Sequence, residues 1–426
     1  MLKIYNYAKG DHKKFFRDKG IDFSQHEKTV KAIIDHIRKD GDKAVREYCE
    51  KFDCTQLNKI GIKTSYPLIK RAYQKVLKKD PFFVKSIKLI IKRVENFHKN
   101  QIEKMFIFSN TKNELLGQII NPIEKVLVYV PGGQAFYPSS LIMNVIPARL
   151  AKVPEIYVTT PVKNNGAVKD ELLCVLYLLG IKEIYHLGGA QALAAFSFGT
   201  KLIPRVHKIV GPGNLFVTLA KKLLIGWIDI DMLAGPSEVV IIADRSVHAR
   251  NIALDILAQA EHDTIASALL ITNSRDLAVK VNHSIRSLLQ RYPDSPARRS
   301  LANCSIVLVE NIKQAFDLSN EIAPEHLEIC LPNPLKYLSM VRNAGSVFLG
   351  ENTPTAVGDY FAGPNHTLPT MGTAKFYSPL GVYDFIKRTG FSYFSREQLI
   401  KSKKFISKIA EIEGLPFHSL SVMLRE

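Results

Sequence analysis

Lys125-Val-Leu-Val-Tyr-Val130 is a short apolar run that leads into the Gly-rich turn Pro131-Gly132-Gly133. Helical sequence follows near residues 140 to 151, so this segment has the form of one strand–turn–helix step of a parallel sheet. The step recurs, and we expect further strands at Glu155 to Thr160, Glu183 to Leu187 and Lys208 to Val210. The sequence from 129 to 238 therefore predicts one α/β domain of ordinary size.

A second series of apolar runs follows the first. We expect its strands at Val239 to Ala243, Ala268 to Thr272, Ser305 to Val309, His326 to Leu331 and Ser346 to Leu349. Helical apolar spacing predicts helices outside the two series at His26 to Lys39, Asp42 to Phe52, Pro67 to Asn100, Asp384 to Lys387 and Ser395 to Glu413.

These patterns predict an α/β fold with two Rossmann-like, incomplete parallel-sheet domains and with helical N-terminal and C-terminal extensions. We divide the chain into an N-terminal arm (1–20), a first α/β domain made of two segments (21–128 and 239–380), a second α/β domain (129–238) and a C-terminal helical arm (381–426). A cleft between two such domains is a common place to hold a cofactor against a substrate.

Composition sets wide limits on the class of protein. A chain of 426 residues is too long for one ordinary core, and 46% hydrophobic residues are enough to fill two. No apolar run reaches the length of a signal core or a membrane span, so we expect no membrane and a cytoplasmic location. The five cysteines include no CxxC pair, which argues against a disulfide framework and a thiolate zinc cluster.

The strong positive charge raises the possibility of a nucleic-acid partner. The net charge is +18, from 58 basic and 40 acidic residues. The lysines, however, form short scattered clusters without interleaved aromatic residues or a finger motif. We therefore expect a generally Lys-rich surface and no nucleic acid.

Three Gly-rich junctions follow strands of the first series and precede helices: the turn at 131–133, Gly188-Gly-Ala-Gln191 and Gly211-Pro-Gly-Asn214. Backbone N–H groups at such helix starts favour a phosphate, although each turn alone could require glycine for steric reasons only. None is a GxGxxG motif, but three in one α/β unit favour a nucleotide. Tyr129, Gln191 and Asn214 lie beside them and are candidate nucleotide contacts.

Gln259 and His262 lie one helical turn apart at the end of an amphipathic helix, Arg250 to Ala260. An amide oxygen and an imidazole nitrogen at this spacing are compatible with zinc. Two ligands do not make a site, and an exposed Gln and His near a helix end are the simpler interpretation of the pair alone.

Other polar residues lie at junctions. Ser237 precedes the first strand of the second series, and Glu325 and His326 begin its fourth strand, which offers a carboxylate and an imidazole for acid–base chemistry. The loop from 357 to 370 is rich in Gly, Pro and polar groups and contains Asp359 and His366. Glu413 and His418 lie almost at the C-terminus, where isolated residues carry little signal.

Taken together, these motifs resemble the histidinol dehydrogenase family over nearly the whole chain. The resemblance rests on Gly41-Asp-Lys-Ala-Val-Arg-Glu-Tyr, Tyr129-Val-Pro-Gly-Gly, Gly188-Gly-Ala-Gln-Ala, Gly211-Pro-Gly-Asn, Ala234-Gly-Pro-Ser-Glu, Gln259-Ala-Glu-His, Ala323-Pro-Glu-His-Leu, Gly363-Pro-Asn-His-Thr-Leu-Pro-Thr and His418. Their order along the chain makes chance agreement negligible.

The resemblance implies one zinc ion per subunit, held by Gln259, His262, Asp359 and His418, with NAD contacted by Tyr129, Gln191 and Asn214. It implies a homodimer with intertwined termini, in which the C-terminal arm brings His418 to a partner subunit. Substrate contacts, which include the metal ligands, match Ser237, Gln259, His262, His326, Asp359, His366, Glu413 and His418.

The activity implied by the resemblance is the NAD-dependent oxidation of L-histidinol through L-histidinaldehyde to L-histidine, the last steps of histidine biosynthesis. His326 matches the base, and Glu325 matches the residue that activates water for the second oxidation. Leu233, Asp263 and the segment 371–378 depart from the commoner pattern. A paralogue that oxidises another small polar alcohol is the nearest alternative; a zinc hydrolase and a basic nucleic-acid-binding protein are the alternatives from other classes.

Overall fold

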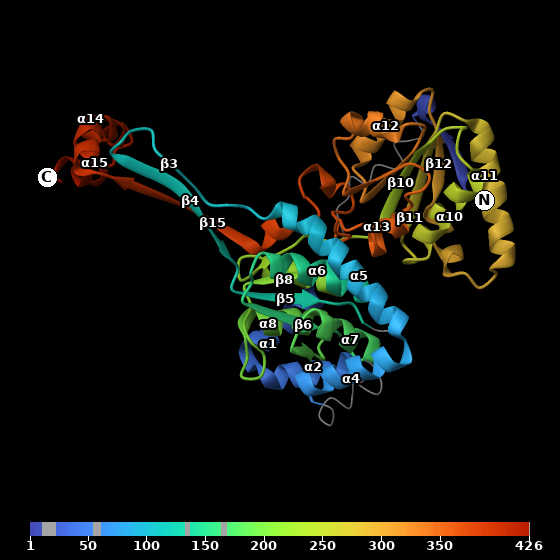
Figure 1. Cartoon of the computed structure of the whole chain (residues 1–426), viewed down its shortest axis with the longest axis horizontal. Helices are drawn as coiled ribbons and strands as arrows, with labels where there is room; N and C mark the ends of the chain where they lie inside the picture. The colour runs from blue at the N-terminus through green and yellow to red at the C-terminus, as the bar shows by residue number, and fades with distance from the viewer. Residues whose placement is uncertain (11–22, 54–60, 133–136, 163–167, 426) are drawn as a thin grey trace.

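The computed structural model describes residues 1–10, 23–53, 61–132, 137–162 and 168–425. It has two α/β lobes, which we call the central lobe and the outer lobe, and an arm that projects from the central lobe (Figure 1). Gly133 of the first Gly-rich turn and residues 11–20 of the expected N-terminal arm lie outside the described residues. Within the described ranges, no helix is both long and apolar enough to span a bilayer.

The central lobe is built on a six-stranded sheet. In spatial order its strands are β2 (Lys63–Ser65), β7 (Glu183–Tyr185), β6 (Glu155–Thr159), β5 (Lys125–Tyr129), β8 (Lys208–Val210) and β9 (Asp229–Ile230). All neighbours are parallel except β2, which pairs antiparallel with β7.

Helices cover both faces of this sheet. One face carries α1 (Glu27–Asp40), α2 (Asp42–Phe52), α8 (Gly189–Phe198) and α9 (Leu215–Leu224); the other carries α4 (Tyr66–Lys79), α5 (Pro81–His98), α6 (Pro138–Leu150) and α7 (Asp170–Leu178). Leu127 of β5 packs into the first core and Val126 and Val128 into the second. Burial on both faces explains why β5 is a continuous apolar run without alternation.

The outer lobe has an all-parallel six-stranded sheet. Its spatial order is β1 (Lys3–Asn6), β12 (Ser305–Leu308), β11 (Ser267–Thr272), β10 (Glu238–Ala243), β13 (His326–Cys330) and β14 (Ser346–Leu349). The helices α10 (Ala249–Ala260) and α11 (Arg275–Arg291) pack on one face and α12 (Ile312–Ile322) on the other, while α13 (Thr355–Tyr360) follows β14.

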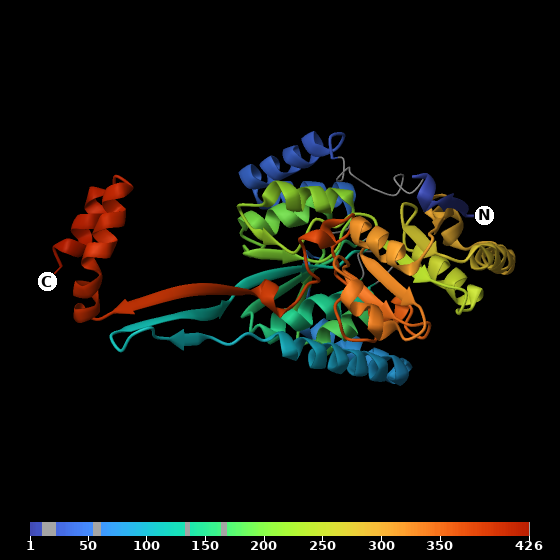
Figure 2. The same cartoon turned by 90° about the horizontal axis from the view of Figure 1, so that it is seen from above.

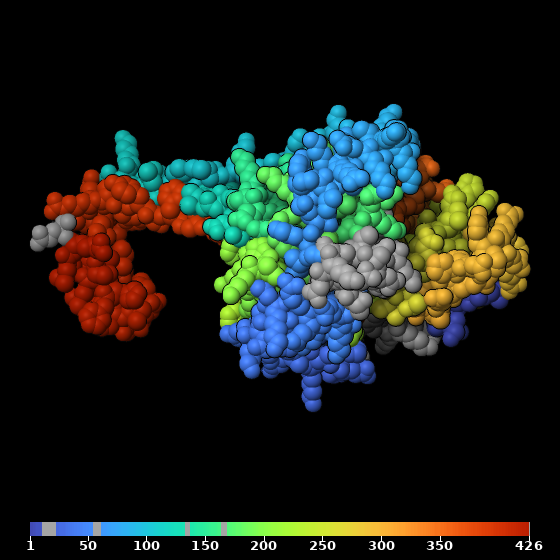
Figure 3. Space-filling view, turned by 90° about the horizontal axis from the view of Figure 1, so that it is seen from below, coloured from blue at the N-terminus to red at the C-terminus, as the bar shows by residue number. Residues whose placement is uncertain are grey.

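The arm is a long projection that stands clear of both lobes (Figures 2 and 3). Its stem is an antiparallel sheet in which β4 (Glu114–Pro122) lies between β15 (Ile386–Phe394) and β3 (Phe106–Phe108). Its tip is a helical pair, α14 (Arg396–Ile412) and α15 (Pro416–Met423). The stem thus pairs residues 106–122 with residues 386–394, which are distant in sequence.

The expected α/β fold class and the strands of both series are confirmed, with ends that differ by one or two residues. The expected helix from 67 to 100 is two helices, α4 and α5, because Pro81 has no N–H to continue α4 and the Asp80 carboxylate accepts the Phe83 N–H as a cap.

Strand pairing divides the chain differently from our expectation. The elements α1, α2, β2, α4, α5 and β5 belong to the central lobe and not to a unit with 239–380. The helices α1 and α2 share a core with α8 and α9, α4 and α5 share one with α6 and α7, and β2 and β5 belong to the central sheet. Lys3–Asn6 is an edge strand of the outer sheet, paired with β12. The C-terminal segment is also not purely helical, since residues 386–394 form β15, where a helix at 384–387 was expected.

Candidate active site

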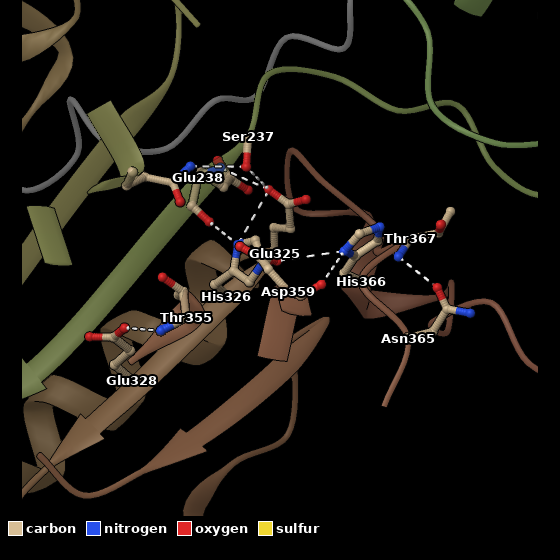
Figure 4. Close-up of polar contacts among 11 residues, drawn as sticks. Ser237, Glu238, Glu325, His326, Glu328, Thr355, Asp359, Asn365, His366 and Thr367 are labelled. Atoms are coloured by element: carbon tan, nitrogen blue, oxygen red, sulfur yellow. Dashed lines mark hydrogen bonds and ion pairs between the residues drawn. The ribbon is translucent and has the colours of Figure 1, made fainter. Parts of the chain in front are cut away.

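Three of the expected residues meet where two neighbouring strands of the outer sheet begin. Ser237 immediately precedes β10, and Glu325 and His326 lie at the start of β13, which pairs directly with β10. The Ser237 hydroxyl donates to Glu325 Oε2 at 2.6 Å, and the Glu238 N–H donates to the same oxygen at 2.9 Å. These contacts, visible in Figure 4, hold the Glu325 carboxylate beside the imidazole of His326.

His326 is buried with a defined hydrogen-bonding direction. Its Nδ1 lies 3.2 Å from the Glu238 carbonyl oxygen and 3.5 Å from Glu325 Oε2. Because a carbonyl can only accept, Nδ1 carries the proton and Nε2 carries the lone pair. Nε2 is buried without a hydrogen-bond partner among the described residues, and burial lowers the pKa of His326, which favours the neutral ring.

Glu325 is a carboxyl group whose ionisation is balanced near neutral pH. Burial raises its pKa to about 7, against the opposing effect of the hydrogen bonds from Ser237 and from the Glu238 N–H. The group is therefore divided between its acid and carboxylate forms at neutral pH, as a general acid–base residue requires.

Asp359 and His366 form the opposite side of the site. Asp359 lies on α13, and His366 lies on the loop that follows it; the His366 Nδ1 donates to the Asp359 carbonyl oxygen at 3.0 Å. The Asp359 carboxylate is 4.0 Å from His326 Nε2 and 3.9 Å from His366 Nδ1. Burial lowers the pKa of His366 to about 4 and raises that of Asp359.

A small enclosed cavity of about 80 Å³ lies between these groups. Polar atoms come from His326, Asp359 and His366, and its apolar wall includes Phe348 and Leu368. Such a cavity, apolar with a few convergent polar groups, suits a small polar ring or chain.

Gln259 and His262 approach the same groups from the end of α10. Gln259 is buried, and its Nε2 donates to the Ser237 hydroxyl at 2.9 Å, which extends the chain of hydrogen bonds to Glu325. His262 is exposed, yet its charge affects the pKa of Glu325, Asp359 and His366 and so lies within electrostatic range. The structure therefore brings seven expected residues together, from Ser237 to His366.

Glu413 and His418 are not in this group. Both are exposed on the helical tip of the arm, which lies at the far end of the molecule from the outer lobe (Figure 1). Among the described residues, no set of three His, Cys, Asp or Glu side chains is arranged to hold a metal ion. Of the four expected zinc ligands, His418 lies far from the other three within one chain. Of those three, only His262 and Asp359 are His, Cys, Asp or Glu side chains.

Tyr129, Gln191 and Asn214 all lie at the carboxyl edge of the central sheet. The Tyr129 hydroxyl accepts the Gly189 N–H at 3.2 Å, and Asn214 caps α9 by accepting the Val217 N–H at 3.1 Å. The edge of a parallel sheet at which helices begin is the usual ligand site of such folds. Tyr129 is buried, which raises its pKa to about 12 and keeps it a neutral phenol.

Sequence reasoning missed two groups that shape these sites. Asp53, at the end of α2, accepts hydrogen bonds from the Gly188 N–H and from Gln191 Nε2, both at 3.1 Å. Glu238 accepts the Met371 N–H at 2.9 Å and offers its carbonyl to His326. Neither residue could be recognised from the sequence, because Asp or Glu is common after a helix and at the start of a strand.

Comparison with known proteins agrees with this geometry. The family model for histidinol dehydrogenase matches residues 17–426. A histidinol dehydrogenase of Clostridium acetobutylicum is 42% identical over 100% of this chain and 99% of its own length, and one of Listeria monocytogenes is 44% identical over 94% and 93%. The crystal structure of histidinol dehydrogenase from Elizabethkingia anophelis superposes with a TM-score of 0.92 at 32% identity, covering 99% of this chain and 97% of that one.

The fold and the relatives define an α/β oxidoreductase built of two lobes. The chain belongs to the histidinol dehydrogenase family, and so to histidine biosynthesis. This confirms the resemblance drawn from the motifs.

Proposed function

We propose that this protein oxidises L-histidinol through L-histidinaldehyde to L-histidine and transfers the two hydrides in turn to two molecules of NAD. The observation that carries the proposal is the buried lone pair of His326 Nε2, which has no hydrogen-bond partner among the described residues and borders the small cavity in the outer lobe. A neutral imidazole held by its Nδ1–H is prepared to accept one proton from a substrate hydroxyl.

In the first oxidation, His326 Nε2 removes the proton from the substrate hydroxyl. Hydride is transferred to NAD from the carbon that bears this hydroxyl. The Glu238 carbonyl oxygen accepts the Nδ1 proton in a hydrogen bond and stabilises the imidazolium that forms. The Asp359 carboxylate, near Nε2, stabilises the same positive charge.

In the second oxidation the aldehyde must first add water. We assign this step to the carboxylate form of Glu325, which removes a proton from the attacking water. The Ser237 hydroxyl and the Glu238 N–H hold the carboxylate at the start of β13 for this purpose. Hydride then leaves the hydrated carbon.

Zinc fits the donor groups that gather around Ser237 and Asp359. Gln259 donates through Nε2 to Ser237, so its Oε1 is the atom available to a metal, and with His262 and Asp359 it makes a nitrogen and oxygen set of the kind that zinc accepts. When bound, zinc would hold the imidazole and amino nitrogens of the substrate.

The fourth ligand is proposed to come from a second copy of the chain. His418 lies on an exposed helix of the arm, beside exposed apolar residues that include Phe417 and Leu420. An apolar surface at the tip of a long projection suits exchange of arms between two subunits. Glu413, on the same tip, would then reach the substrate of the partner subunit.

We assign NAD to the carboxyl edge of the central sheet, with contacts from Tyr129, Gln191 and Asn214. The position is supported by the three helix starts at this edge, although Asp53 and Tyr129 already accept the first N–H groups of α8. We also place the reaction in the cytoplasm, where the four described cysteines, all free and buried, would remain reduced.

One assay tests the proposal. Purified protein loaded with zinc is expected to form two NADH per L-histidinol, and a chelator should abolish the reaction until zinc is restored. A panel of other small amino alcohols serves as the control, because preferential turnover of one of these would identify a paralogue. Absence of NADH formation from L-histidinol by the zinc-loaded protein would overturn the proposal.

A further inference from the structure

A buried ion pair inside the central lobe contacts the turn that begins at Gly211. Lys221 of α9 and Asp231, which follows β9, are both almost completely buried, with side-chain exposures of 3% and 1%. Their charged atoms, Nζ and Oδ1, are 2.6 Å apart. Charged groups so far from water are costly unless their remaining hydrogen bonds are satisfied.

Those remaining bonds go to both polar groups of one residue, Gly211. Lys221 Nζ donates to the Gly211 carbonyl oxygen at 2.6 Å, and the Gly211 N–H donates to Asp231 Oδ2 at 2.7 Å. Gly211 has a positive φ of 109°, and a side chain there would come within 2.1 Å of the Tyr129 carbonyl oxygen. The pair thus holds a backbone conformation that glycine alone permits.

The same pair connects two functional segments. Gly211 begins the turn that ends in Asn214, and Asp231 begins the crossover from 231 to 237, which ends in Ser237. Asp231 Oδ1 also accepts the Met232 N–H at 2.7 Å, and Thr218 of α9 donates to the Ala234 carbonyl oxygen at 3.1 Å. The helix α9 is therefore tied to the crossover at two points, one helical turn apart.

We propose that Lys221 and Asp231 are positioning residues: they fix the Gly211–Asn214 turn relative to the crossover that carries Ser237, and so set the place of the dinucleotide against the substrate. This inference rests on the proposed function, because it takes Asn214 to contact NAD. A displacement of about 1 Å in such an arrangement is enough to reduce the rate on the order of a hundredfold.

A neighbouring ion pair provides a matched control. Lys208, on β8, is also buried and pairs at 2.8 Å with Asp229, its register partner on β9. The Lys208 ammonium donates to Asp229 at the opposite end of the same two strands, away from the turn and the crossover. Asp229 is exposed, so the match lies in the two buried lysines: a purely structural need for a buried lysine charge would affect Lys208 and Lys221 alike.

The test compares three variants with the wild-type, full-length protein. In the double variant Lys221→Met, Asp231→Leu, both charges are replaced by apolar groups, so that no single buried charge is left. In Thr218→Val, only the second tie to the crossover is lost. Lys208→Met is the control. For each we would measure KM and kcat for NAD, NAD binding by calorimetry, and the thermal unfolding midpoint.

We expect KM for NAD and its dissociation constant to rise on the order of tenfold in the double variant and less in Thr218→Val. The control should keep both constants. If the double variant fails to fold, Thr218→Val decides the matter. If the wild type binds and reduces NAD and the variants keep its KM and dissociation constant for NAD, this inference alone is overturned. A wild type that neither binds nor reduces NAD would overturn the proposed function instead.

Discussion

His326 and His366 show how residue environment separates two chemically identical side chains. Both are buried, and both use Nδ1 to donate to a backbone carbonyl. On His326, Nε2 is buried, has no hydrogen-bond partner in the described part of the chain and lies 4.0 Å from the Asp359 carboxylate. On this ground His326 is the proposed base, while His366 is proposed to contact the substrate as a neutral ring.

Replacement of the proposed base tests this distinction. We expect His326→Asn to lower kcat by about 10²–10⁴-fold, since general base catalysis has that size, and to leave the zinc content unchanged. The control is His98→Asn. His98 is likewise buried, has an Nε2 without a partner among the described residues and lies outside the site. Loss of zinc from His326→Asn would indicate a ligand and not a base.

The raised pKa of Glu325 predicts a pH dependence for the second oxidation. A carboxyl group with a pKa of about 7 is a neutral acid below that value and a carboxylate above it, and only the carboxylate can remove a proton from water. The rate from L-histidinaldehyde should therefore rise as pH increases through about 7.

In Glu325→Gln this rise should disappear, and the yield should fall from two NADH per L-histidinol toward one. Stopped-flow measurement of NADH formation from the alcohol and from the aldehyde separates the two steps. A Gln variant with the normal yield would show that another group activates the water.

Among the elements, the arm's stem depends on the packing of its strands. A side chain at Gly117 of β4 would come within 2.5 Å of the Phe106 carbonyl oxygen and 2.6 Å of the Phe391 ring. At Gly390, on the neighbouring strand β15, the nearest atom would be 4.0 Å away. The two positions therefore differ in the space available for a side chain, although both lie in the same sheet.

We expect Gly117→Ala to weaken the stem by ~1–3 kcal/mol, because the added methyl group forces the strands apart, and Gly390→Ala to be nearly neutral. Hydrogen–deuterium exchange of the β4 and β15 amides measures this directly. Equal exchange in both variants would contradict the packing described here.

At the scale of the whole molecule, the proposed zinc site is incomplete within one chain. Asp359 lines the cavity, Gln259 donates to Ser237, and His262 lies within electrostatic range of Asp359, whereas His418 lies on α15, at the tip of the arm (Figure 1). A shared site predicts that two inactive chains complement each other. Coexpressed His262→Asn and His418→Asn chains should form mixed dimers in which one of the two sites has no substitution.

With random pairing, about a quarter of the wild-type activity should return, since half of the dimers are mixed and each has one intact site. Differently tagged chains allow the mixed dimer to be isolated and assayed. No recovery in that dimer would mean that His418 serves its own chain or is not a ligand.

The sequence by itself determined most of the secondary structure and the family. Apolar runs such as Lys125–Val130 indicate burial whatever lies next to them, and ordered motifs such as Gln259-Ala-Glu-His identify a lineage without any structure. Both signals are local in the chain, so the family and most strands of both sheets could be predicted, whereas the edge strands β1, β2 and β9 were not.

Only the tertiary structure decided which sheet each strand joins and which side chains meet. Ser237 and Glu325 are hydrogen-bonded although 88 residues apart, and Lys3–Asn6 pairs with residues 305–308. The proton position on His326, the pKa of Glu325 and the contacts of Asp53 follow from such pairings. The physical reason is that periodicity records whether a residue is buried, whereas its partner is set by packing between segments that are distant in sequence.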